Sequence, residues 1–154
     1  MTSSTVASPP SPTVSDRTRK KPVPLPTPET AHFWAEAAHE RLVVQRCLSC
    51  HIAYFYPRDF CPGCSSEDVE WIECSGRASL HTYVIEHRPG PGFEGQGPYV
   101  VAVVELEEGP RMMTNIVGVE PDPDLLPLDL ALVVRFESRG DAKVPVFEPA
   151  RNFS

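Results

Sequence analysis

The chain has 154 residues, which allows one medium domain or a small module joined to a small domain. Its net charge is −7, and the acidic excess lies after residue 30, where 19 acidic side chains accompany ten basic ones. A body this acidic repels phosphate backbones, which argues against nucleic acid as the main ligand. Eighteen prolines argue against a helical bundle. No apolar run approaches the length of a membrane span, so we expect no membrane partner.

Residues 1–28 are rich in proline, serine and threonine and show no apolar periodicity. This composition predicts a disordered or polyproline-type arm. The arm carries a basic cluster for which a solvated patch is a simpler interpretation than an acidic partner: Arg17, Arg19, Lys20 and Lys21. The charged start, apolar core and cleavage site of a secretory leader are not found, so we expect a cytoplasmic protein.

A short helix is predicted directly after the arm. Thr30 can cap its start, and Phe33 and Trp34 lie on its apolar side. A tryptophan beside a phenylalanine on so small an element indicates packing, either against the rest of the chain or against a partner. Residues 42–45 then favour a strand that leads into the first of several cysteines.

Four cysteines form two CxxC pairs, Cys47 with Cys50 and Cys61 with Cys64, and ten residues separate the pairs. Each pair can sit on a tight turn that aims both sulfurs at one point, and two such turns complete a tetrahedron. The spacing therefore predicts a four-thiolate zinc site. Because four thiolates close the coordination shell and leave no position for an activated water, we expect the zinc to be structural.

Three other uses of these cysteines fit less well. Disulfides suit small secreted chains, and no leader pattern precedes this one. Cys50 and His51 complete a CxxCH haem-attachment signature, but haem attachment needs export and leaves the second pair unexplained. A thioredoxin-like pair opens a helix, whereas Pro62 and Gly63 favour a turn. Cys74 lies outside the spacing and is expected to be a small, buried or half-buried hydrophobic residue.

The rest of the chain has the pattern of short strands with no helix between them. Alternating and β-branched segments predict strands at residues 69–74, 77–88, 99–106, 111–117, 131–137 and 143–147. Gly- and Pro-rich segments separate several of these strands. Five or six short strands over about eighty residues predict a small closed antiparallel barrel, for which the five-stranded OB-fold fits best.

Several unrelated motifs occur in a fixed order along residues 29–149. They are His32-Phe33-Trp34, the segment 42–45 before the first CxxC, Tyr56-Pro57-Arg58 before the second, Ser75-Gly76, Pro98-Tyr99-Val100-Val101 and Glu105-Leu106-Glu107-Glu108-Gly109. With these motifs the chain resembles the family catalogued as domain of unknown function 35, described as acyl-CoA-associated. The resemblance implies a mainly β protein with a short N-terminal helix and a rubredoxin-like zinc ribbon at 29–68, an OB-fold barrel at 69–149, and a tail at 150–154.

The resemblance also implies a function. Members of this family accompany thiolase-superfamily enzymes in actinobacterial steroid side-chain degradation and in archaeal acyl-CoA condensation. It implies a non-catalytic accessory subunit in lipid metabolism that docks on a thiolase, or on a lipid-transfer-protein-like aldolase that cleaves its acyl-CoA by a retro-aldol step. The accessory subunit would help to bind or channel the acyl-CoA, and the catalytic residues would belong to the partner.

The chain departs from the family pattern at two places. The family commonly has glycine after the second cysteine of each pair, where this chain has His51 and Ser65. His51 is expected to take a left-handed turn conformation that glycine adopts more easily. The family also places Ile-Gly before the penultimate strand, where this chain has Leu128-Asp129, so a different turn is expected there.

Four residues are candidates for contacts with the CoA ester that the resemblance implies. Arg58 and Arg88 lie near flexible loops and offer forked donors for phosphates. Phe93, in the Gly/Pro-rich loop, and Tyr99, just after it, are candidates to cover the adenine or line a channel. Phe93 serves equally well as an anchor for its own loop.

Two other classes of function are left open. A single-stranded nucleic-acid-binding OB-fold protein would use aromatic platforms, but the acidic body opposes it. A stand-alone enzyme would need a nucleophile with a matched base. His81 and His87 share a face in the strand pattern, but the spacing suggests no Ser or Cys partner for either, and both are expected to be exposed.

Overall fold

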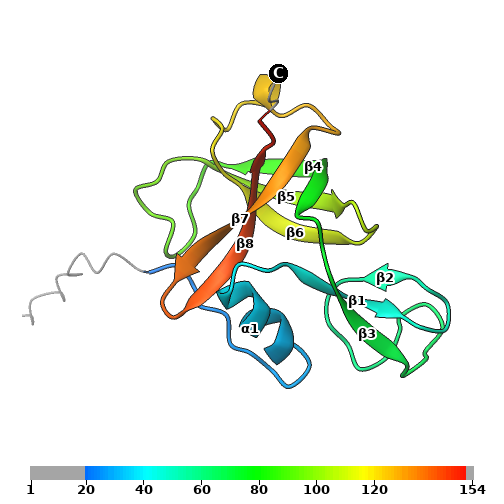
Figure 1. Ribbon diagram of the computed structural model, residues 1–154. Helices are drawn as coiled ribbons and strands as arrows, with labels where there is room; N and C mark the ends of the chain where they lie inside the picture. The colour runs from blue at the N-terminus through cyan, green and yellow to red at the C-terminus, as the bar shows by residue number, and fades with distance from the viewer. Residues whose placement is uncertain (1–19, 152–154) are drawn as a thin grey trace, which may run out of the picture.

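The computed structural model describes residues 20–151, in which one helix precedes two β-sheets (Figure 1). Helix α1 is Ala31–Ala38, and the strands are β1 (Val43–Cys47), β2 (Ala53–Tyr54), β3 (Val69–Glu73), β4 (Arg77–Glu86), β5 (Tyr99–Leu106), β6 (Arg111–Ile116), β7 (Ala131–Arg139) and β8 (Ala142–Pro149), with the 3-10 turn η1 at Pro123–Leu125. Residues 1–19 of the predicted arm and 152–154 of the tail lie outside the described residues. Among the described helices, none is long and apolar enough to cross a bilayer.

The first sheet has the order β2-β1-β3 and is antiparallel throughout. Strand β1 pairs along its whole length with β3, from Val43 opposite Glu73 to Cys47 opposite Val69. Sequence reasoning had given residues 69–74 to the barrel, and this was wrong, because β3 is the third strand of the ribbon. An alternating pattern predicts a strand but does not name its pairing partner.

The second sheet closes into a five-stranded barrel in the order β4-β5-β6-β8-β7. Its neighbouring strands are antiparallel except β6 and β8, which close the barrel in parallel through Ile116 and Phe147. Together with the helix and the ribbon, the barrel confirms the predicted mainly β fold class. At the Leu128-Asp129 departure, Asp129 adopts φ 66° and its N–H donates to Leu80 O at 2.8 Å, so a non-glycine residue still brings the chain onto β4.

Strand β4 contains a bulge that explains its irregular sequence pattern. Leu80 pairs with Val104 and Thr82 with Val103, so one extra residue, His81, is accommodated between them. A bulge reverses the alternation beyond it. Leu80 is buried before the bulge, whereas Thr82 and Val84, which strict alternation would place on the same face as Leu80, are exposed.

The helix, the ribbon and the barrel share one hydrophobic core. It joins Phe33 of α1 and Val44 of β1 with Leu80, Val104 and Phe147 of the barrel, all buried. Helix α1 lies against β1 and β8 (Figure 1). The packing explanation for the aromatic pair on this helix therefore holds for Phe33.

The start of α1 differs from the prediction in one detail. Thr30 is the N-cap residue, but its side chain makes no capping bond to the helix. Its hydroxyl is buried and accepts a hydrogen bond from the Thr27 N–H at 2.8 Å instead. Thr30 thus stabilises the turn that enters the helix rather than the helix N–H groups themselves.

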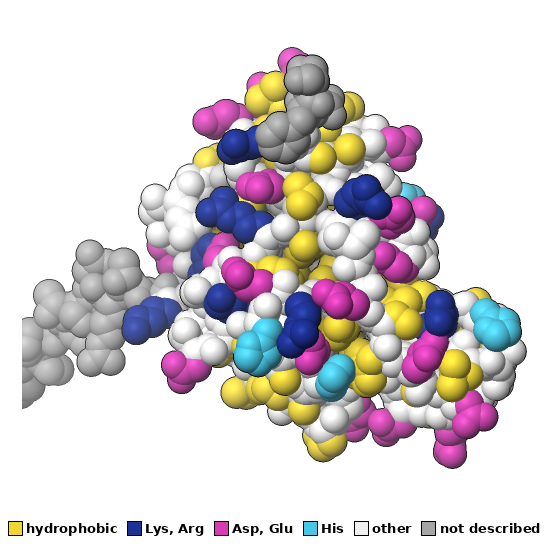
Figure 2. Space-filling model, viewed as in Figure 1, with side chains coloured by type: hydrophobic (Ala, Val, Ile, Leu, Met, Phe, Trp, Pro, Cys, Tyr) yellow, Lys and Arg dark blue, Asp and Glu magenta, His cyan; other side chains and the backbone are white. Residues whose placement is uncertain are grey.

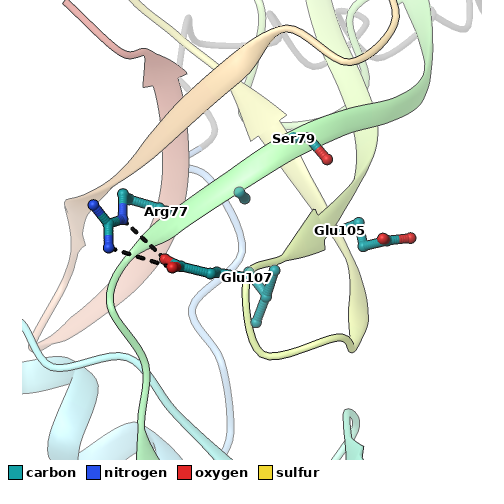
Figure 3. A pocket seen from close by; sticks show the side chains of 6 residues that line it. Arg77, Ser79, Glu105 and Glu107 are labelled. Carbon is teal, nitrogen blue, oxygen red and sulfur yellow. Dashed lines mark hydrogen bonds and ion pairs between the residues drawn. The ribbon is translucent and has the colours of Figure 1, made fainter.

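The turn between β5 and β6 holds the junction of ribbon and barrel. The carboxylate of Glu107 accepts a hydrogen bond from the Ser75 hydroxyl at 2.7 Å. It also accepts one from Arg77 Nε at 2.9 Å (Figure 3). Glu108 accepts from the Ser75 N–H at 2.7 Å. The shallow hollow beside Arg77 is thus crossed by an ion pair within the chain, and we interpret it as structural.

The last part of the predicted arm has a defined path over the barrel. Lys21 Nζ bonds to Glu137 Oε1 at 2.9 Å and lies 4.8 Å from the centre of the Phe93 ring. Residues 20–28 are the end of the arm predicted to be disordered or polyproline-type, and Lys21 joins this end of the arm to the barrel. The segment has no apolar periodicity, and its contacts with the barrel include those of Lys21 and a close approach to the loop that carries Gly92.

Gly92 is the position at which the arm approaches the barrel loop most closely. A Cβ there would lie 2.6 Å from Lys21 Cα and 2.8 Å from Lys20 O, which is closer than real contacts allow. We expect Gly92→Ala to displace the arm and raise amide hydrogen exchange around Val23. Gly95→Ala is the matched control, because Gly95 has a similar φ of +81° but open space around it. Equal exchange in the two variants would contradict the contact.

Candidate metal centre and neighbouring ligand surface

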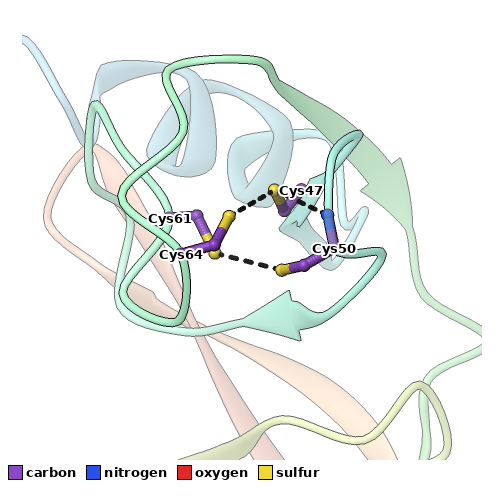
Figure 4. A group of neighbouring side chains, drawn as sticks. All are labelled: Cys47, Cys50, Cys61 and Cys64. Atoms are coloured by element: carbon purple, nitrogen blue, oxygen red, sulfur yellow. Dashed lines mark hydrogen bonds between the residues drawn. The ribbon is translucent and has the colours of Figure 1, made fainter.

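The four predicted cysteines converge on one point. Their Sγ atoms all lie within 4.8 Å of one another (Figure 4). The Sγ atoms of Cys47 and Cys64 are 3.5 Å apart, and those of Cys50 and Cys61 are 3.6 Å apart. A tetrahedron with Zn–S bonds of about 2.3 Å has sulfurs about 3.8 Å apart, so the cluster has the size of a zinc site.

The two CxxC turns are built alike. The N–H of His51 donates to Cys47 O at 3.0 Å, and the N–H of Ser65 donates to Cys61 O at 2.9 Å. His51 and Ser65 have φ of 65° and 64°, in the left-handed region where the family commonly has glycine. The left-handed conformation predicted for His51 is confirmed, and each turn keeps the same geometry with a non-glycine residue.

Backbone donors favour thiolates at this site. The N–H groups of Cys50 and Ser49 point at Cys47 Sγ from 3.4 and 3.3 Å, and Gly63 N–H is 3.3 Å from Cys61 Sγ. The bond from Cys50 N–H contributes most to lowering the pKa of Cys47, to about 6. Because the thiolate is the form that binds zinc, these donors prepare Cys47 for the metal. At Cys50 and Cys64 a backbone hydrogen bond also favours the thiolate, but desolvation and the neighbouring sulfurs outweigh it and raise the pKa, to about 12 for Cys50. Cys47 and Cys61 are buried, which closes the inner side of the site.

Cys74 lies outside this cluster, as its spacing predicts. It is half-buried at the ribbon–barrel junction, and burial raises the pKa of its thiol to about 12. A thiol that stays protonated is a poor nucleophile and a poor metal ligand.

The structure brings together two of the four predicted CoA contacts. Phe93 and Tyr99 stack with ring centres 4.5 Å apart and planes 19° apart. Arg58 lies on the ribbon loop before Cys61, where its N–H donates to Gln45 Oε1, and Arg88 follows β4 with an exposed side chain. Within the described residues, the cations that lie over the Phe93 ring are Lys21 and Arg139, not these two arginines.

Lys21 and Arg139 are the cations that sequence reasoning missed. Arg139 Cζ lies 5.8 Å from the centre of the Phe93 ring, and Lys21 Nζ lies 4.8 Å from it. Both side chains also contact the carboxylate of Glu137. Arg139 was missed because the predicted strand, 131–137, ends two residues before it. Lys21 was missed because its segment is predicted to be a solvated arm. The pair Arg139-Gly140 could have indicated a turn with an arginine at its start, because glycine favours the turn that here joins β7 to β8.

Two adjoining hollows lie beside this cluster. The first, of about 350 Å³, is lined by the aromatic pair and Arg139 together with Val101, Met113, Thr114, Asn115, Val144 and Pro145. The second, of about 270 Å³, is apolar and lies between α1, the ribbon and the barrel, with Phe33, Trp34, Phe55, Tyr56, Met112, Met113, Val144 and Pro145 in its wall. Because Met113, Val144 and Pro145 belong to both, the two hollows form one continuous surface.

The charge over the face of the molecule shown in Figure 2 is mixed. Acidic and basic side chains are interspersed over this face. Such a surface lacks the continuous positive patch that binds a nucleic-acid backbone.

Comparison with known proteins identifies the family. The model for a rubredoxin-like zinc ribbon domain of ChsH2 matches residues 34–70, and the model for the C-terminal OB-fold domain of ChsH2 matches residues 71–137. A Methanocaldococcus jannaschii protein named DUF35 domain-containing scaffold protein is 37% identical over 95 residues, which cover 61% of this chain and 67% of that protein. The chain belongs to the DUF35 family.

Two other known proteins are similar over more of the chain. A solved structure described as Ltp2-ChsH2(DUF35) aldolase contains a chain that is 36% identical, with a TM-score of 0.74; the match covers 84% of this chain and all of that one. A Thermomonospora curvata protein named "Probable enoyl-CoA hydratase alpha subunit" is 39% identical over 146 residues. That match covers 90% of this chain but 44% of the relative, so the chain spans less than half of that relative's length.

Proposed function

We propose that the chain is an accessory subunit that docks on a thiolase-superfamily enzyme, such as a lipid-transfer-protein-like aldolase, and contributes no catalytic residue itself. The observation that carries this proposal is the likeness to the DUF35 chain of the Ltp2-ChsH2 aldolase. The match covers all of that chain and 84% of this one. Steroid side-chain degradation is the setting that the family resemblance suggests. The closed cysteine shell supports a structural rather than a catalytic metal.

We further propose that this subunit helps to bind or channel the acyl-CoA of the complex. The apolar hollow between α1, the ribbon and the barrel suits an acyl or pantetheine segment, and Phe93 and Tyr99 offer a flat wall next to it. Arg58 and Arg88 remain candidates for phosphate contacts because both side chains are exposed. The complex and its ligand are expected to act in the cytoplasm.

The test is co-expression of the full chain with a thiolase-superfamily subunit from the same genome. We expect a tag on either subunit to retain the other through size-exclusion chromatography. We also expect the complex to cleave or condense an acyl-CoA that neither subunit converts alone. Separation of the two subunits, together with unchanged turnover when this chain is added, would refute the proposal.

A further inference from the structure

Arg139 has more hydrogen-bonding capacity than the described chain uses. Its side chain is only 13% exposed, and within residues 20–151 its side-chain hydrogen bonds are limited to one, from Nε to Glu137 Oε1 at 3.4 Å. A guanidinium carries five N–H donors, and buried donors normally have partners. The only sealed side-chain polar atom without a partner among the described residues is Glu108 Oε2, so the terminal nitrogens of Arg139 are not sealed. Arg139 lines both the hollow beside the aromatic pair and a neighbouring one that Lys21 and Glu137 also line.

The first of these hollows has an aromatic wall beside this guanidinium. Tyr99 and Phe93 stack almost parallel, and both line the same hollow as Arg139. Tyr99 covers one face of Phe93 and the two cations lie over the other, so the outer face of Tyr99 is the ring face left for a ligand. Asn115 also lines it, and its amide nitrogen donates to Val100 O at 2.9 Å, which leaves its carbonyl oxygen as an acceptor. A flat ring with an exocyclic amine and an attached anion matches this combination of stacking wall, acceptor and forked cation.

The carboxylate of Glu137 forms ion pairs with both cations, Lys21 and Arg139. It lies 2.9 Å from Lys21 Nζ and 3.4 Å from Arg139 Nε. Burial opposes its charge, but hydrogen bonding and attraction from Lys21, and attraction from Arg139, give it a lowered pKa, so it stays ionised at neutral pH. One carboxylate against two cations leaves a net positive charge at the edge of the hollow. A phosphate with more negative charge than a carboxylate is suited to compete for Arg139.

We propose that Arg139, with Lys21 and the Phe93–Tyr99 wall, binds the adenosine diphosphate portion of a nucleotide-bearing ligand, with Arg139 on the phosphates. This inference rests on the proposed handling of acyl-CoA and deepens it, because CoA carries such a portion. It adds Arg139, which sequence reasoning did not select, to Arg58 and Arg88 as a residue for the phosphate contact.

The test uses the full chain and ADP as the probe, with binding measured by calorimetry or NMR titration. We expect Arg139→Gln to weaken ADP binding about tenfold or more, because a charge-assisted forked contact is lost. Arg135→Gln is the matched control on the same strand, since that arginine is 62% exposed and is not in the hollow. Glu137→Gln is expected to tighten ADP binding, because it removes the competing carboxylate.

Adenosine, which lacks phosphates, is a second probe that reports stacking of the base without the contribution of charge. Tyr99→Leu is expected to weaken both adenosine and ADP, because it removes the ring face left for stacking, whereas Arg139→Gln should leave adenosine unchanged. If Arg139→Gln proves unfolded, Arg139→Lys keeps the charge without the fork and should still weaken ADP binding severalfold. CoA should compete with ADP for the site.

Three results would overturn the inference: no ADP binding at millimolar concentration, equal affinity in the Arg139 and Arg135 variants, or tighter Arg139-dependent binding of a single-stranded oligonucleotide than of ADP. The proposed function has its own readout, because co-purification with the thiolase-superfamily subunit does not depend on nucleotide binding. If the Arg139→Gln chain still co-purifies with the thiolase-superfamily subunit and binds ADP as tightly as wild type, the inference is refuted but the proposed function is not.

Discussion

Replacing Cys61 by serine is expected to abolish stoichiometric zinc binding and to unfold the ribbon. Cys61 is buried at the centre of the cluster, and its sulfur lies 3.6 Å from that of Cys50. The satellite core around it consists of Cys47, Cys61 and Tyr54 with Val69 packed against them, which is too little apolar area to fold the knuckles without metal. Zinc binding contributes on the order of 10 kcal/mol to such small sites, so losing one thiolate removes most of the folding free energy of the ribbon.

Native mass spectrometry should show one zinc per wild-type chain and none in Cys61→Ser. Hydrogen exchange should rise across β1, β2 and β3 and change much less in β5, which pairs with β4 and β6 in the barrel. Cys74→Ser is the control, because Cys74 is the one cysteine outside the cluster, and we expect it to keep its zinc. A Cys61→Ser chain that retained one zinc, or a wild-type chain with two disulfides and no metal, would refute the four-thiolate centre.

The zinc site and most strands could be predicted from the sequence because their signals are local. Two CxxC pairs with a short spacer define the ligands without knowledge of the rest of the chain. The expected strand at residues 99–106 coincides with β5, because β-branched residues fill it and glycine or proline bounds it on each side. The turns after Cys50 and Cys64 kept their geometry despite lacking glycine, since hydrogen bonds to the cysteine carbonyls hold them.

The errors concern relations between distant segments. Strand β3 pairs with β1, more than twenty residues earlier, and nothing within residues 69–74 specifies that partner. The bulge at His81 shifts the faces of β4, which no fixed period can describe. Lys21 meets Phe93 and Glu137 only through folding, so composition assigned it to a disordered arm. The candidate ligand surface was half predicted for the same reason: its aromatic residues are close in sequence, and its cations are not.

Phe33→Ala is expected to destabilise the whole molecule without releasing zinc. Phe33 is 2% exposed and contacts Trp34 edge-on at 4.9 Å and Phe55 of the ribbon at 5.4 Å between ring centres. It belongs to the core that α1, the ribbon and the barrel share, whereas Cys47 and Cys61 belong to a separate cluster. Truncating a buried phenylalanine costs about 3–5 kcal/mol, a large part of the 5–15 kcal/mol typical of a domain.

Denaturant unfolding in the presence of zinc should show this loss as a lower midpoint with one zinc still bound in the native state. Leu25→Ala is the control: Leu25 is 87% exposed, so its truncation should change the free energy of unfolding by less than about 0.5 kcal/mol. Because Phe33 also forms part of the wall of the apolar hollow, the variant should lose any ligand that occupies it. A Phe33→Ala chain as stable as wild type would mean that α1 is not packed into the shared core, and the continuous surface across helix, ribbon and barrel would then have no rigid support.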